Sequence, residues 1–276
     1  MTNKHGEFVW YELMTRDPDG AKAFYDGVVG WNIGERPPGD MDYRIIDAGE
    51  GPPSNDSAPS RAGDRYVGGV LRLTDEMCAH GARAVWLGYV GADDVDATIT
   101  KLEGLGGRVL VPAKDIPAVG RIAMVTDPQG VPFYVMRGMG EDGTSTAFKP
   151  MADGHCAWNE LSTPDQAGAL SFYGKLFGWV SNEAMPMGEM GDYAFLDHNG
   201  GRIGAVMRHH GNDGVPGWTY YFHVADIDAA KAKVDSRGGK ILQEPHEVPG
   251  GEHIIVGTDP DGTVFALVGP RATAIQ

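Results

Sequence analysis

The chain has 276 residues, which is enough for about two domains of ordinary size, and its 38 acidic residues outnumber the 23 Lys and Arg, for a formal net charge of −15. Such a charge repels phosphate backbones and anionic lipid surfaces, so we expect neither nucleic acid nor membrane partners. The two cysteines lack the spacing of a metal site, and the N-terminus lacks a secretory apolar run. We therefore expect a soluble cytoplasmic protein.

An internal repeat divides the chain into two copies. Similar segments recur in the same order at an offset of 148 and then of 132 residues: 10–13 and 158–161, 24–31 and 172–179, 94–97 and 226–229, 126–130 and 258–262. The difference in offset gives the first copy about 16 extra residues, which we assign to the Gly-, Pro- and Ser-rich stretch 49–64, a candidate lid or subunit contact. We predict domains at residues 1–140 and 150–271, with a linker at 141–149.

The elements of the first copy follow from its hydrophobic pattern. Residues 8–15 alternate with the period of a strand, and Asp17 and Pro18 then open a helix that runs toward Gly30. Strands at 43–46 and 67–73 follow. The same plan starts again with a strand at 85–90, a helix at 94–105, and strands at 108–111, 122–125 and 133–136. Each copy is thus predicted to be α+β, with two βαβββ modules.

This pattern resembles the vicinal-oxygen-chelate superfamily, which includes glyoxalases, bleomycin-resistance proteins and dioxygenases. The resemblance rests on the opening strand, the helix ending in Phe-Tyr-x-x-x-x-Gly-Trp (24–31 and 172–179), and the Asp-Pro-x-Gly turn before the last strand (127–130 and 259–262). The most similar subgroup is that of two-domain actinobacterial antigen or "hydroxylase-like" proteins. The resemblance implies that each pair of modules curls into an open, cup-shaped mixed sheet with flanking helices. Fold alone does not fix the reaction in such a family.

The resemblance also implies a divalent metal held by His, Gln or Glu on inward-facing strand positions. The matching positions here are Trp10, Leu87 and Tyr134 in the first copy and Trp158, Thr219 and Ala266 in the second. Indole, alkyl and methyl groups offer a cation no suitable donor. We therefore predict no metal ligands and no cofactor, with a divalent metal as the lesser alternative.

A carboxylate in an aromatic pocket is predicted in place of the metal. Glu12 and Glu160 lie two residues after Trp10 and Trp158 and should face the same side of the strand. Desolvation would raise the pKa of each carboxyl group toward a range useful for proton transfer, which makes both glutamates candidate catalytic residues. The alternative is a structural glutamate, paired with an arginine such as Arg72 or Arg121 or accepting a tyrosine hydroxyl.

The candidate ligand-binding residues complete these pockets. They are Trp10, Tyr89, Tyr134, Trp158, Tyr221 and His223. The alternative for the two Trp is that they fill the space left by a lost metal. His223 shares a strand face with Thr219 and Tyr221 and could reach the second pocket. The adjacent His209 and His210 are expected on the solvated surface.

These residues favour a small-molecule protein over other classes. The leading interpretation is a protein that binds an aromatic or carbonyl-bearing ligand and works, if it is an enzyme, as a metal-independent lyase or isomerase with a glutamate as general base. A second interpretation is a drug- or metabolite-sequestering protein similar to bleomycin-resistance proteins. A third is a metal-dependent enzyme of the glyoxalase or extradiol-dioxygenase type, with ligands drawn from His223, Glu160 or His253.

Overall fold

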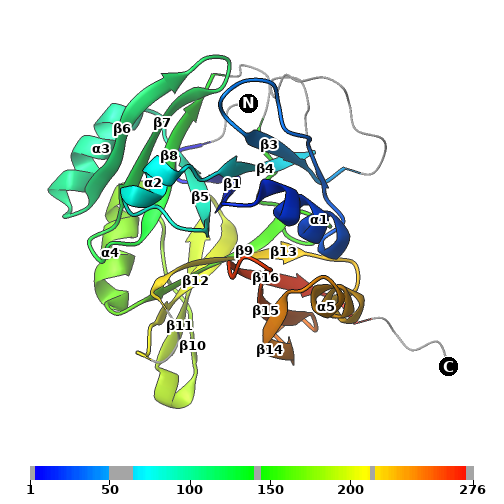
Figure 1. The fold of residues 1–276 in the computed structure, drawn as a ribbon. Helices are drawn as coiled ribbons and strands as arrows, with labels where there is room; N and C mark the ends of the chain where they lie inside the picture. The colour runs from blue at the N-terminus through cyan, green and yellow to red at the C-terminus, as the bar shows by residue number, and fades with distance from the viewer. Residues whose placement is uncertain (1–3, 50–64, 140–143, 212–214, 272–276) are drawn as a thin grey trace.

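The computed structural model describes residues 4–49, 65–139, 144–211 and 215–271. It contains two eight-stranded mixed sheets, one from each half of the chain (Figure 1). This confirms the predicted α+β class with two tandem copies. The stretch proposed as a lid or subunit contact falls almost entirely at 50–64, outside the described residues.

The first half follows the predicted order, with two elements that were not located from the sequence, a two-residue strand after the first helix and a short helix between the modules. Its elements are β1 (Phe8–Thr15), α1 (Pro18–Val28), β2 (Asn32–Ile33), β3 (Tyr43–Asp47), β4 (Tyr66–Arg72), α2 (Asp75–Ala79), β5 (Val85–Gly91), α3 (Val95–Gly104), β6 (Arg108–Ile116), β7 (Gly120–Thr126) and β8 (Pro132–Gly138).

The second half repeats this plan, with a 3-10 turn in place of part of a loop. Its elements are β9 (Cys156–Thr163), α4 (Gln166–Phe177), β10 (Ala184–Pro186), η1 (Gly188–Met190), β11 (Asp192–His198), β12 (Gly201–Arg208), β13 (Gly217–His223), α5 (Ile227–Ser236), β14 (Lys240–Glu247), β15 (His253–Thr258) and β16 (Val264–Gly269).

The two sheets have the same strand order. The first runs β2-β3-β4-β1-β5-β8-β7-β6, and the second runs β10-β11-β12-β9-β13-β16-β15-β14. Within each module the first and last strands pair in parallel, and the two modules join through antiparallel central strands, β1 with β5 and β9 with β13. The central strands therefore lie in the middle of each sheet. We call the face of the first sheet that carries Leu87, Tyr89 and Tyr134 the first cup. The face of the second sheet that carries Trp158, Tyr221 and Ala266 is the second cup.

The opposite faces of the two sheets pack against each other in a single apolar core that contains residues of both halves. Helices of the two halves meet at its margins, α1 with α5 and α3 with α4 (Figure 1). On β5, Gly88 gives its backbone N–H to the hydroxyl of Tyr220 on β13 at 2.7 Å. A Cβ at this glycine would lie 2.8 Å from that hydroxyl, so the close approach of the halves requires glycine there.

The repeated Phe-Tyr and Asp-Pro-x-Gly motifs contact each other across the two halves. Tyr25 of α1 donates to Asp259 Oδ2 at 3.1 Å, and Tyr173 of α4 donates to Asp127 Oδ2 at 3.2 Å. The other oxygen of each aspartate accepts backbone N–H groups of its own turn, for example Val131 N at 2.9 Å from Asp127. Each motif therefore shapes its own turn and also binds the opposite copy.

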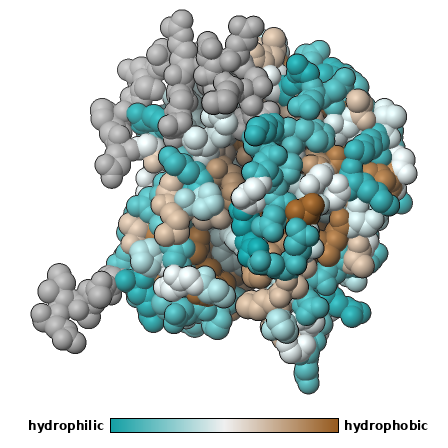
Figure 2. All heavy atoms as spheres, turned by 180° about the vertical axis from the view of Figure 1, so that it is seen from behind, coloured by the Kyte–Doolittle hydropathy of each residue, from teal (hydrophilic) through white to brown (hydrophobic). Residues whose placement is uncertain are grey.

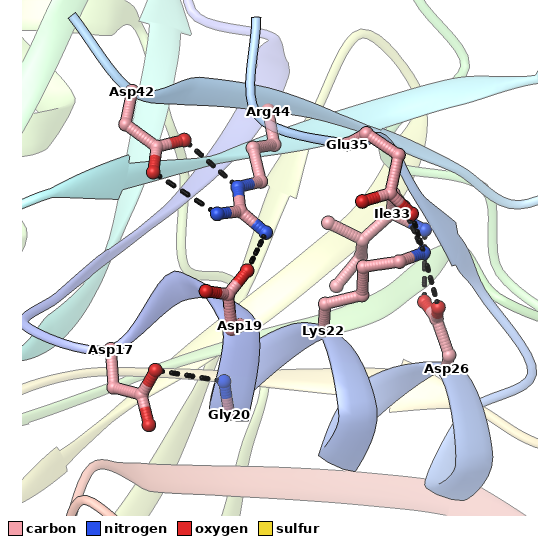
Figure 3. Close-up of polar contacts among 9 residues, drawn as sticks. All are labelled: Asp17, Asp19, Gly20, Lys22, Asp26, Ile33, Glu35, Asp42 and Arg44. Carbon is pink, nitrogen blue, oxygen red and sulfur yellow. Dashed lines mark hydrogen bonds and ion pairs between the residues drawn. The ribbon is translucent and has the colours of Figure 1, made fainter.

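Ion pairs of the buried Arg44 tie helix α1 to the neighbouring strand β3 (Figure 3). Asp17 caps the helix by accepting the N–H of Gly20 at 2.9 Å. On β3, Arg44 is only 2% exposed and pairs with Asp42 at 2.8 Å and with Asp19 of the helix at 2.7 Å. Because side chains alternate along a strand, this anchor on the helix side directs the preceding Tyr43 into the first cup.

The surface is mainly polar on the side turned away from the view of Figure 1, with apolar atoms gathered toward its middle (Figure 2). In the described ranges, none of the helices combines the length and apolar character that a membrane span requires.

The described part of the predicted linker packs against the protein, since Ala147 is fully buried and Ser145 Oγ donates to the carbonyl oxygen of Val9 at 2.6 Å.

Candidate functional site

The central strand β1 presents alternate side chains to the two faces of its sheet. Trp10 joins the apolar cluster of the first cup, whereas Tyr11 and Leu13 lie in the core shared by the halves. The pairing of β1 with β5 is irregular between Phe8 and Trp10 and regular from Trp10 to Met14. Glu12 is therefore on the cup face, as the alternation predicted.

Three tyrosines from three strands surround the carboxyl group of Glu12 in the first cup, and Trp10 contacts one of them. Tyr89 of β5 donates its hydroxyl to Glu12 Oε2 at 2.7 Å. Trp10 donates its indole N–H to the hydroxyl of Tyr43 on β3 at 2.8 Å. Tyr134 of β8 stacks on Tyr89, with ring centroids 4.2 Å apart and planes 13° from parallel. The predicted ligand-binding residues of the first copy are thus brought together around the carboxyl group.

The carboxyl group of Glu12 is strongly desolvated. Its residue is 2% exposed, and within the described part of the chain its Oε1 has no hydrogen-bond partner. Burial raises the pKa of Glu12 to about 7, against the hydrogen bond from Tyr89, which lowers it. This group can exchange a proton near neutral pH, as a general acid or base must.

The second cup repeats the arrangement around Glu160. Trp158 donates its indole N–H to the hydroxyl of Tyr193 at 2.8 Å, and Tyr193 in turn donates to Glu160 Oε2 at 2.6 Å. Tyr221 donates to Glu160 Oε1 at 3.1 Å. Burial raises the pKa of Glu160, while the hydrogen bonds from the two tyrosines lower it. Each cup therefore holds an indole and a carboxyl group with tyrosine hydroxyls around it, from three tyrosines in the first cup and two in the second.

Tyr43 and Tyr193 are members of these arrays that the sequence interpretation missed. The strand register shows that the two tyrosines correspond. Tyr43 pairs with Leu71 on β4, and Tyr193 lies opposite Met207 on β12, because the next residue, Ala194, pairs with Val206. Leu71 and Met207 hold the same position in the two halves, since they pair with Met14 on β1 and Ser162 on β9. The ring of Tyr43 lies over Gly69, where a Cβ would approach its hydroxyl to 2.3 Å. The available signal was a tyrosine two strands away from each glutamate in the sheet.

The two cups differ in how far they are closed. In the first cup, Tyr134 fills the position next to Tyr89, and Glu12 is buried. In the second cup the strand partner of Tyr221 is Ala266, and Glu160 keeps partial solvent exposure. Helix α2 also adds Met77 and Cys78 to the apolar cluster of the first cup. Glu160 is therefore more accessible to solvent than Glu12.

The arginine and the histidine that were predicted near the cup glutamates have other partners. Arg121 pairs with Asp96 and Asp115 on the surface and not with a cup glutamate. The glutamates accept hydrogen bonds from tyrosine hydroxyls, which is one of the two structural roles considered for them. His223 lies between Asp153 and Glu252, at 2.7 and 2.9 Å, and its ring hydrogen-bonds with these two carboxylates instead of with the Glu160 array.

The residues of the cups do not match the donor set of a metal centre. The family's ligand positions carry indole, alkyl, phenol, hydroxyl and methyl groups at Trp10, Leu87, Tyr134, Trp158, Thr219 and Ala266. Each cup supplies one carboxyl group, and that group already accepts hydrogen bonds from tyrosines. In the described ranges, no group of three or more His, Cys, Asp or Glu side chains is arranged to hold an ion. We therefore derive no chemical step through a metal.

Comparison with known families identifies the fold. The model of the Glyoxalase/Bleomycin resistance protein/Dioxygenase superfamily matches residues 7–135 and 154–267. The chain belongs to this superfamily. The two matches cover both halves, which confirms the resemblance seen in the repeated motifs.

Among curated members of the superfamily, similarity extends over nearly the whole chain. "Putative glyoxylase CFP32" of Mycobacterium tuberculosis is 30% identical over 263 residues, covering 95% of this chain and 94% of that protein. "Anthracycline biosynthesis protein DnrV" of Streptomyces peucetius is 28% identical over 280 residues, covering 95% and 93%. The similarity therefore extends over both halves of this chain.

Solved structures of the superfamily share the fold at low sequence identity. The Mn(II)-bound glyoxalase from Novosphingobium aromaticivorans has a TM-score of 0.61 at 19% identity, covering 97% of this chain and 82% of that one. The substrate complex of homoprotocatechuate 2,3-dioxygenase from Brevibacterium fuscum has a TM-score of 0.62 at 14% identity, covering 99% and 83%. Both neighbours are enzymes of the superfamily, and at these identities the likeness concerns the fold alone.

Proposed function

We propose that this superfamily member binds a planar aromatic or carbonyl-bearing small molecule in its cups and transfers a proton with a cup glutamate, without a metal. The observation that carries the proposal is the repeated array in which a carboxyl group of raised pKa lies between tyrosine hydroxyls beside an indole. Aromatic pockets with a few convergent polar groups are typical small-molecule sites.

The proton transfer follows from the protonation state of the glutamates. An ionised Glu160 takes a proton from the carbon next to a substrate carbonyl group. The electron pair of the broken C–H bond forms a C=C bond, and the π electrons of the carbonyl group move to its oxygen to give an enolate. Returning the proton to another carbon gives an isomer, and losing a leaving group gives a lyase product. A carboxyl group with a pKa near the working pH is effective in both directions, as the value of about 7 for Glu12 illustrates.

The names of the relatives support an aromatic or carbonyl-bearing ligand. One curated relative is named as an anthracycline biosynthesis protein and another as a putative glyoxylase. A fused aromatic ring system would stack against Trp158, which is partly exposed in the second cup. Its oxygen atoms would meet the hydroxyls of Tyr193 and Tyr221.

Binding and proton transfer can be tested separately. Binding of 2-hydroxyanthraquinone is measured by quenching of tryptophan fluorescence, and proton transfer by exchange of the α-protons of 1-tetralone with deuterated solvent, followed by NMR. We expect both signals in the presence of EDTA. Glu160→Gln should abolish exchange and keep binding within a few-fold, whereas Glu103→Gln on the exposed side of α3 should change neither.

The outcomes distinguish the candidate functions. Binding without exchange for any variant would contradict proton transfer and favour a sequestering protein. Exchange that is lost with EDTA and restored by one metal ion would contradict a metal-independent reaction. Absence of both binding and exchange would overturn the proposal as a whole.

A further inference from the structure

The second cup carries polar side chains at three positions where the first cup is apolar. The strand registers of the two sheets show that Ser162 corresponds to Met14, His209 to Leu73, and Thr219 to Leu87. Met14, Leu73 and Leu87 belong to the apolar cluster of the first cup and are 3%, 5% and 1% exposed. All three polar counterparts are partly exposed.

The backbone places these residues on the cup face. Ser162 follows Glu160 by two residues on β9, so both side chains point to the same side. The N–H of His209 donates to the carbonyl oxygen of Thr163 at 2.8 Å, just as the N–H of Leu73 donates to Thr15 at 2.8 Å in the first half. His209, expected on the solvated surface, is partly exposed and occupies the position that Leu73 has in the first cup.

Ser162 and His209 form a pair. Ser162 Oγ lies 3.2 Å from His209 Nδ1, within hydrogen-bonding distance. Residues two apart on a strand are separated by roughly 6.5 Å, so the pair lies about that far along the cup from the carboxyl group of Glu160. On the neighbouring strand Thr219 lies directly opposite Glu160, with a shorter side chain than Leu87 in the first cup.

We propose that Ser162 and His209 form a second polar subsite of the second cup, which binds an oxygen atom at the end of a planar aromatic ligand remote from Glu160. This inference rests on the proposed function and adds two points to it. It assigns binding to the second cup, and it restricts the ligand to ring systems with hydroxyl or carbonyl oxygens at both ends. An imidazole and a hydroxyl together can both donate to and accept from such an oxygen.

The test compares two probes that differ in one distal hydroxyl group, 2,6-dihydroxyanthraquinone and 2-hydroxyanthraquinone. Dissociation constants are measured by calorimetry for the wild-type protein and for the double variant Ser162→Met/His209→Leu, which copies the first cup. Ser162→Ala serves as a milder variant, and His210→Leu changes the adjacent histidine while keeping the pair. Thermal melting verifies that each variant is folded.

We expect the wild-type protein and His210→Leu to bind the dihydroxy probe about five- to tenfold more tightly than the monohydroxy probe, as one added hydrogen bond allows. The double variant should lose this preference while keeping its affinity for the monohydroxy probe, and Ser162→Ala should reduce the preference. An unchanged preference in the double variant, or equal wild-type affinities for the two probes, would overturn the subsite and leave the proposed function standing. Binding of neither probe would overturn both.

Discussion

The buried carboxyl group of Glu12 predicts a specific dependence of stability on pH. Burial raises its pKa from 4.5 to about 7, so between these values the folded protein binds more protons at this group than the unfolded chain does. The contribution of the protonated group to the free energy of unfolding is fully present below about pH 4.5 and is lost as the pH rises through about 7. At 1.36 kcal/mol per unit of pKa, the loss amounts to about 3 kcal/mol.

Glu12→Gln removes this titration and keeps the shape of the side chain. Relative to wild type, the variant should gain about 2 to 3 kcal/mol in free energy of unfolding between pH 5 and pH 8.5, and it should be the more stable protein at pH 8.5. Urea denaturation followed by circular dichroism at both pH values measures this difference. Taking the difference between two proteins cancels the titration of all other groups.

Two controls sharpen the comparison. Glu160→Gln should change stability in the same direction but by less, because Glu160 is partly exposed. Glu103→Gln makes the same chemical exchange on the exposed side of α3. A difference between wild type and Glu12→Gln that stays constant with pH, or one that favours wild type at pH 8.5, would refute the conclusion that burial raises the pKa of Glu12.

Three further changes test contacts of the fold and the cups. Tyr173→Phe removes the hydroxyl that donates to Asp127, and urea denaturation should show a loss of about 1 to 3 kcal/mol, with no loss contradicting the cross-copy contact. Arg44→Met leaves Asp42 buried without its cation, which should cost about 3 to 5 kcal/mol, and a neutral effect would show that the pair does not anchor β3. Tyr134→Ala removes a stacked ring from the first cup and should cost about 3 kcal/mol in thermal unfolding, whereas retained stability would mean that the ring is not part of a packed interior.

Much of the fold could be predicted because the signals are local and occur twice. Alternation along residues 8–15 identifies a strand, and it also places Trp10 and Glu12 on one face without any knowledge of neighbouring strands. The short helix α2 was not predicted. Its five residues carry too little periodicity to distinguish a helical turn from a loop.

The missed parts of the site depend on pairing between strands. Tyr43 and Tyr193 are 150 residues apart, an offset that neither of the two repeat spacings gives, because loops of different length precede the strands that carry them. His209 and His210 follow the end of β12, and which of the two faces the cup depends on the register of that strand with β9. Contacts across the copies, such as Tyr25 with Asp259, leave no trace in the spacing of either motif.

The exchange of tyrosine–aspartate contacts between the halves also determines how the chain unfolds. Each half supplies a hydroxyl to a turn of the other, and the apolar faces of the two sheets bury each other. Separating the halves would expose that core and leave both aspartates without their donors, so neither sheet can open while the other stays intact. The peptide connection keeps the partners at a high effective concentration. The two sheets should therefore melt together as one cooperative unit, even though the sequence is that of two domains.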